Sequence, residues 1–181
     1  VALLVIAFLR SGDLGFLALM ATAAGAGGWM ILQFKPYIAN RFGAWRHVWE
    51  HAADSGGFQQ TRTMCAAASG GLVGVGAGKG WLEGVFAANT DLVFGMLCEE
   101  WGLLIAVLAV LSILTLTVFA ARACRVGRSA FPTIAACAAG SLLAAQTALN
   151  VFGAMDLLPL TGVTLPFVSN GGSAMIASWG L

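Results

Sequence analysis

"WGLLIAVLAVLSILTLTVFAA", residues 101–121, is an apolar run without a single charged residue. An α-helix rises 1.5 Å per residue, so these residues predict a helix of about 31 Å, which matches a hydrocarbon core of roughly 30 Å. The run extends back to Leu92 with Glu99 and Glu100 as its only charges, and these carboxylates are expected at one membrane interface. The composition agrees, because 59% of the 181 residues are hydrophobic and only 9% are charged. We predict an all-α integral membrane protein.

Further apolar runs lie on both sides of this segment and extend the prediction to a polytopic helical bundle. The predicted spans are residues 1–9 (partial), 14–34, 92–121, 132–154 and 171–181 (partial). The chain begins and ends inside apolar runs, so we interpret residues 1–181 as a single membrane domain that is a fragment of a larger protein.

Residues 35–91 form a long polar loop that is too long to be a simple connector, so we expect it to be functional or separately folded. Within it, "FQQTRTMCAAA" (58–68) predicts a short helix ended by two glycines. Positive charge in short loops marks the cytoplasmic face, and Arg122, Arg125 and Arg128 lie in such a loop. We therefore predict that residues 35–91 face the outside of the cell. The net charge of +1 gives no reason to expect nucleic acid as a partner.

The glycine-rich stretch "SGGLVGVGAGKGWLEG" (69–84) resembles a phosphate-binding loop. The Walker motif needs a glycine five residues before its Gly-Lys pair and Ser or Thr after it, whereas Val73 and Gly80 stand at those positions. A Walker-type nucleotide site is therefore not expected. We interpret the glycines as residues that allow a re-entrant loop to pack closely over a cavity.

Three acidic residues are candidates for chemistry, and each has a structural alternative. Asp91 opens the predicted third helix, where it serves either as a helix N-cap or as a reactive carboxylate. Glu99 and Glu100 are costly near a membrane core unless they face a cavity or a partner charge. They are therefore either functional or part of an ion pair with an arginine of the loop.

Other polar residues leave similar alternatives open. Gln146 and Asn150 share one helix face, where they either bond to another helix or mark a transport path. Arg41 and Arg46 suit either phosphate binding or an interface anchor. Lys79 is one charge in a flexible loop, and alone it indicates little.

His47 and His51 have the i, i+4 spacing of a metal pair. No H-E-x-x-H motif accompanies them, so a surface position is favoured.

Three separated stretches together resemble the SEDS family of shape, elongation, division and sporulation proteins. They are "GGFQQTRTMCAAASGGLVGVGAGKG" (56–80), "NTDLVFGMLCEEWGLL" (89–104) and "QTALNVFGAMDLLPLTGVTLPFVSNGGSAM" (146–175). The last resembles a family signature of the form Pro-x-x-Gly-x-x-x-Pro-Phe-x-Ser-x-Gly-Gly-Ser. The sequence departs from the family pattern at Phe58 and Asn170, where Tyr is usual, and at "FAANTD" before the helix.

The resemblance implies a membrane protein of about ten spans, in the bacterial cytoplasmic membrane, that polymerises lipid II into glycan strands on the outer face. It implies a class B penicillin-binding protein as transpeptidase partner and a role in division, elongation or sporulation. By the same resemblance Asp91 is the catalytic carboxylate and Glu83 a second functional acid. The expected substrate-binding residues are Arg41, Arg46, Gln59, Gln60, Lys79, Glu99, Glu100, Gln146, Asn150, Ser169 and Ser173.

Glycosyl transfer from a lipid pyrophosphate needs a base for the attacking hydroxyl and positive charge for the leaving group. Arg41, Arg46 and Lys79 are candidates for that positive charge, and so is a divalent cation, Mg²⁺ or Mn²⁺, for which we predict no protein ligands. Two alternatives to an enzyme are a flippase for lipid II and a scaffold that recruits an external enzyme through the long loop.

Overall fold

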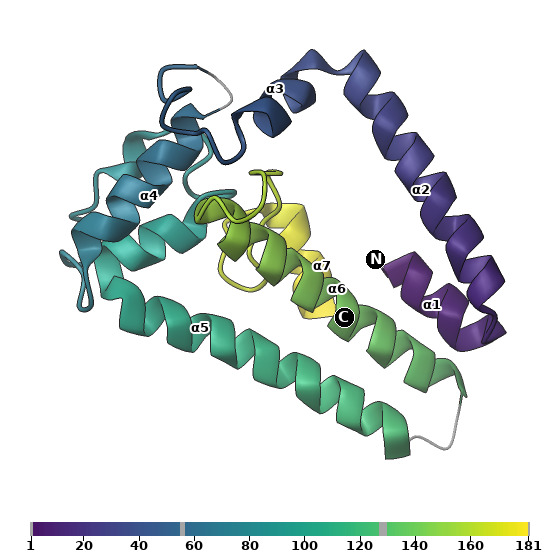
Figure 1. The fold of residues 1–181 in the computed structure, drawn as a ribbon. Coiled ribbons are helices and arrows are strands. Elements are labelled where there is room, and N and C mark those ends of the chain that lie inside the picture. Colours follow the sequence, from purple (N-terminus) through teal and green to yellow (C-terminus); the bar gives the residue numbers. More distant parts are fainter. Residues whose placement is uncertain (1, 55–56, 127–129, 181) are drawn as a thin grey trace.

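The computed structural model describes residues 2–54, 57–126 and 130–180, and all regular secondary structure in these ranges is helical (Figure 1). Residues 1 and 181 of the predicted partial spans lie outside the described residues, and so does Arg128. The all-α prediction is confirmed.

Three of the described helices are long and apolar enough to cross a membrane. They comprise Leu14–Phe34, Val93–Arg122 and Phe131–Ala154. The first is helix α2, Leu14–Phe34, and it covers the same residues as the predicted span. The Asp13 carboxylate caps its start by accepting a hydrogen bond from the Gly15 N–H at 2.8 Å.

The other two spans lie within α5 (Val93–Val126) and α6 (Ala130–Ala154). The remaining elements are shorter, and they are α1 (Ala2–Ser11), α3 (Pro36–Ala44), α4 (Phe58–Gly70), the 3₁₀ turn η1 (Leu82–Gly84) and α7 (Gly172–Gly180). Helix α4 confirms the short helix predicted in the long loop, and it ends at Gly70 as the two glycines indicated.

Helix α5 differs from the uninterrupted helix that the apolar run predicted. Gly102 has φ 85° and ψ 164°, which breaks the helix just after Glu99 and Glu100. Only glycine adopts such a conformation readily, and the loop also packs here, because a Cβ at Gly102 would overlap the Leu72 carbonyl. The hydrophobic run concealed this break because glycine is compatible with a membrane helix.

The elements are arranged so that the loops meet at one end of the bundle (Figure 1). Helices α5 and α6 pack against each other, and α4 packs on the first turns of α5. The loop at residues 71–92 and the loop at residues 155–171 lie at that end, while the α1–α2 turn and the C-terminal end of α5 lie at the other. A small core of Ala66, Leu82, Leu92 and Leu160 joins the two loops to α4, and Met96 of α5 packs against it.

Candidate functional site

A cavity of about 710 Å³ opens at the loop end of the bundle, beside Asp91. It is lined by Arg41, Ala53, Phe58, Gln59, Val85, Phe86, Ala87 and Asp91. Residues from α3, from the start of α4 and from the segment before α5 thus converge, although they are far apart in the sequence. The lining combines one carboxylate, one guanidinium, one amide and two aromatic rings.

Arg41 is held in a fixed orientation in the cavity wall. Its Nη1 donates a hydrogen bond to the Leu160 carbonyl at 2.9 Å, and its Nη2 donates to the Gln59 Oε1 at 2.8 Å. Gln59 in turn donates through Nε2 to the Phe86 carbonyl at 2.9 Å. Arg41 and Gln59, both predicted as substrate-binding residues, are brought together with Asp91.

Asp91 lies two residues before the start of α5 and lines the same cavity. Its main chain is bonded on both sides, because its N–H donates to the Ala87 carbonyl at 2.9 Å and its carbonyl accepts from Asn150 Nδ2 at 3.0 Å. Within the described residues, these main-chain bonds are the hydrogen bonds that the structure shows for Asp91. Its carboxylate is therefore available to a ligand in the cavity.

The Asp91 carboxylate and the Arg41 guanidinium both lie close to Gly162, a residue that the sequence did not single out. A Cβ added at Gly162 would stand 3.1 Å from the Asp91 Oδ2 and 3.7 Å from the Arg41 Nη1. The two charged groups therefore face the same glycine. Gly162 also has φ +72°, a conformation that other residues rarely adopt. Gly162 is the glycine of the Pro-x-x-Gly stretch in the sequence. Only the fold shows that its lack of a side chain leaves space beside the side chains of Asp91 and Arg41.

Glu99 and Glu100 are placed away from this cavity, where they bind the backbone of the glycine-rich loop. Glu99 is 1% exposed and accepts hydrogen bonds from the Trp81 N–H at 2.9 Å and the Leu82 N–H at 3.1 Å. Glu100 accepts one from the Gly78 N–H at 3.0 Å. Among the described residues, the partners that the structure shows for these two carboxylates are backbone amides. Substrate binding by either residue stays a prediction.

Three more of the predicted binding residues are buried and bonded to main-chain carbonyls. Gln60 donates to the Gly153 carbonyl at 2.7 Å, which ties α4 to the end of α6. Asn150 and Ser169 bond to the segment that carries Asp91. None of the three lines the Asp91 cavity.

The other predicted residues also lie outside the cavity lining. Glu83 is exposed on η1, and Lys79 is exposed in the glycine-rich loop. Arg46 stacks on the Trp45 ring at 5.4 Å and donates its N–H to Asp156. Gln146 is half-buried on α6, and Ser173 is exposed near the start of α7.

The residues around the cavity do not form a complete metal site. Within the described ranges, no three His, Cys, Asp or Glu side chains converge. His47 and His51 pair with Glu50 and Asp54 at 3.5 and 3.0 Å on the surface. The cavity itself offers one carboxylate, from Asp91. Such a donor set fits Mg²⁺ only where the phosphates of a substrate supply further oxygens.

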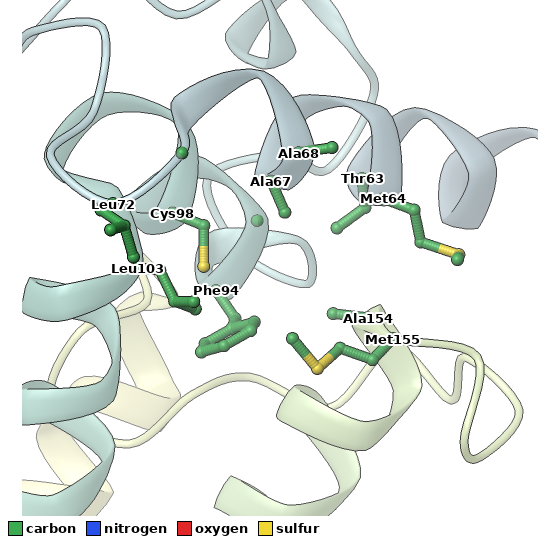
Figure 2. Close-up of a pocket in the computed structure, with 12 residues that line it drawn as sticks. Thr63, Met64, Ala67, Ala68, Leu72, Phe94, Cys98, Leu103, Ala154 and Met155 are labelled. Carbon is green, nitrogen blue, oxygen red and sulfur yellow. The ribbon is translucent and has the colours of Figure 1, made fainter.

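A second cavity, of about 500 Å³, lies between α4, α5 and α6 (Figure 2). Its lining includes Met64, Phe94, Cys98, Leu103 and Met155, which Figure 2 shows around the hollow. None of the lining residues is charged. Because this lining offers neither a carboxylate nor a basic side chain, the cavity at Asp91 is the better candidate for acid–base chemistry.

The family model for cell cycle proteins of the FtsW, RodA and SpoVE type matches residues 1–181. The chain is 35% identical over 170 residues to a probable peptidoglycan glycosyltransferase FtsW of Tolumonas auensis, which covers 90% of this chain and 43% of that relative. It is 29% identical over 177 residues to the peptidoglycan glycosyltransferase RodA of Mycobacterium bovis, with 97% and 37% covered. The chain spans about two fifths of the length of these relatives.

Proposed function

The chain belongs to the SEDS family of membrane proteins, and from this premise we propose that it is part of a peptidoglycan glycosyltransferase that polymerises lipid II. The observation that carries the proposal is the cavity in which the Asp91 carboxylate and the Arg41 guanidinium face the same glycine. The names of the similar proteins support the reaction class, because both are peptidoglycan glycosyltransferases.

The cavity offers the two groups that this transfer needs. A hydroxyl oxygen of the acceptor sugar forms a bond to the anomeric carbon of the donor sugar, while the bond from that carbon to the lipid pyrophosphate breaks. Asp91 accepts the proton of the attacking hydroxyl, since a sugar hydroxyl is a poor nucleophile at neutral pH. Arg41 stabilises the negative charge that develops on the departing pyrophosphate, because its fork of donors suits phosphate.

A divalent cation would be held by Asp91 together with the phosphates of the substrate. When bound, such an ion supplies further neutralisation of the leaving group. Among the described residues, Arg41 is the basic side chain that lines the cavity together with Asp91, while Arg46 and Lys79 lie outside the lining. We therefore assign the leaving group to Arg41 first.

We also propose an orientation of the chain in the membrane. We place residues 35–91 and the loop at residues 155–171 on the outer face of the bacterial cytoplasmic membrane, as the short arginine-containing loop predicts. Both loops lie at one end of the bundle, which supports this placement because they must then lie on the same side of the membrane (Figure 1). A class B penicillin-binding protein is the proposed transpeptidase partner, in division, elongation or sporulation.

The test is polymerisation of labelled lipid II by the complete protein, purified in detergent together with its partner. We expect wild type to form polymer and Asp91→Asn to lose about 10²- to 10⁴-fold in rate, the usual contribution of a general base. Asp54→Asn is the matched control, because Asp54 is an exposed acid of the same loop that pairs with His51. Equal rates for Asp91→Asn and wild type would remove Asp91 from the mechanism.

The same preparation separates an enzyme from a flippase. In liposomes, a flippase moves labelled lipid II across the bilayer without forming polymer. Asn150, one of the two polar residues behind the flippase alternative, already donates to two backbone carbonyls. The structure therefore favours the enzymatic proposal over a polar transport path at this residue.

A further inference from the structure

Three consecutive carbonyls, at residues 89–91, accept hydrogen bonds from segments that are distant in sequence. The Asn170 N–H donates to the first at 2.9 Å, the Ser169 hydroxyl to the second at 2.7 Å and the Asn150 amide to the third at 3.0 Å. Ser169 is 3% exposed and Asn150 is 2% exposed. Two buried side chains thus hold the main chain on which Asp91 is carried.

Each of these side chains also binds a second segment, so it joins two parts of the site. Asn150 Nδ2 donates to the Val163 carbonyl at 2.7 Å, next to Gly162. The Ser169 Oγ accepts a hydrogen bond from the Leu165 N–H at 2.7 Å. Asn150 therefore links the main chain at Asp91 to the segment beside Gly162, whose added Cβ would stand 3.1 Å from the Asp91 Oδ2.

The Asp91 carboxylate depends on these bonds because the hydrogen bonds shown for Asp91 within the described residues are all to its main chain. A side chain whose polar end makes no hydrogen bond takes its position from the main chain that carries it. The turn before it is also fixed, since Ala87 has φ 63° and its carbonyl accepts from the N–H groups of Thr90 and Asp91. Displacing the 89–91 carbonyls therefore displaces the carboxylate.

We propose that Asn150 and Ser169 are positioning residues that set the place of the Asp91 carboxylate through its main chain, without touching the substrate. This inference rests on the proposed function. It replaces the substrate-binding role predicted for both residues with one that their burial and bonding partners support. The two roles predict different kinetic effects. Loss of a positioning residue lowers kcat, whereas loss of a residue that contacts the bound substrate raises KM.

The first experiment compares kcat and KM for lipid II in the complete protein. Ser169→Ala and Asn150→Ala are expected to lower kcat by about 10- to 100-fold, the effect of misplacing a reacting group by about 1 Å, with KM within about two-fold. Ser169→Thr keeps the hydroxyl and is expected to restore most of the turnover.

Two matched variants control for a general loss of packing. Thr147 is 2% exposed on α6, and the hydrogen bond that its hydroxyl donates among the described residues stays within its own helix, to the Leu143 carbonyl at 2.8 Å. Ser178 is 9% exposed on α7 and donates to the Ala174 carbonyl at 2.8 Å. Thr147→Val and Ser178→Ala are expected to keep kcat within about two-fold. The inference is overturned by a rise in KM at unchanged kcat, or by an equal loss of kcat in the controls.

A second experiment reads the position of residue 91 without any activity. Asp91→Cys is introduced with Cys65→Ser, because Cys65 is the exposed native thiol among the described cysteines, and its labelling rate with a water-soluble maleimide is measured. Adding Ser169→Ala is expected to change this rate at least about three-fold, whereas adding Ser178→Ala is not. If wild type forms no polymer, the proposed function fails, and this labelling comparison alone decides the inference. Equal labelling rates of Asp91→Cys with and without Ser169→Ala would overturn the inference.

Discussion

Asp91 and Glu99 are two acids at the loop end of the same helix, and the structure treats them in opposite ways. Glu99 is held by its carboxylate, whose two oxygens accept hydrogen bonds from the Trp81 and Leu82 amides. Asp91 is held by its main chain, and its carboxylate faces a cavity. A buried carboxylate whose two oxygens both accept hydrogen bonds from backbone amides stabilises the fold, whereas one that is held only at its backbone can take up a proton or a ligand.

Among the effects that this comparison predicts, the largest concerns the position of the Asp91 carboxylate. Asp91→Glu keeps the charge but moves it by one methylene, so we expect polymerisation to fall about 100-fold, or about 2.7 kcal/mol in the barrier. The melting temperature should stay at the wild-type value, because the main-chain bonds of residue 91 are retained. Wild-type turnover in this variant would mean that the placement of the carboxylate is not critical.

The next effect concerns the stability that Glu99 provides. Glu99→Gln keeps one acceptor oxygen and turns an amide donor toward the second backbone N–H, which leaves that N–H unsatisfied. We expect the free energy of unfolding to fall by about 1–3 kcal/mol, measured by thermal or denaturant unfolding in detergent. Unchanged stability would contradict the structural role assigned to this carboxylate.

A smaller effect is expected at Gly162, where crowding and backbone strain can be separated. Gly162→Ala places a methyl group 3.1 Å from the Asp91 Oδ2, and we expect about a ten-fold lower rate, or about 1.4 kcal/mol. Gly12→Ala is the control, because Gly12 has φ +62° with no atom within 4 Å of the added Cβ. Both variants should lose about 1 kcal/mol of stability through strain, but only the first should lose activity. A similar loss of activity in both would contradict crowding as the cause.

The smallest effect is expected for Glu100→Gln. Glu100 accepts one hydrogen bond, from the Gly78 N–H in an exposed loop, and glutamine retains an acceptor there. We expect a change in unfolding free energy of less than about 0.5 kcal/mol, as measured beside Glu99→Gln. A loss as large as that of Glu99→Gln would show that burial does not distinguish the two neighbours.

Much of the fold follows from local sequence. The helix at residues 14–34 and the end of α4 at Gly70 agree with what the apolar run and the glycine pair predicted. The break at Gly102 escaped prediction because its cause lies outside the run, in the loop at residues 71–74 that packs against it. Local patterns thus predicted where helices form, but not where distant segments interrupt them.

The sequence by itself determined the helical membrane class, since uncharged runs of about 20 residues have few other stable environments. It also identified Asp91 and Arg41 as candidate residues. Only the tertiary structure decided that these two line one cavity while Glu99, Asn150 and Ser169 bind backbone groups. The physical reason is that a polar side chain has the same chemistry in both settings, and its role depends on which distant donors and acceptors the fold brings to it.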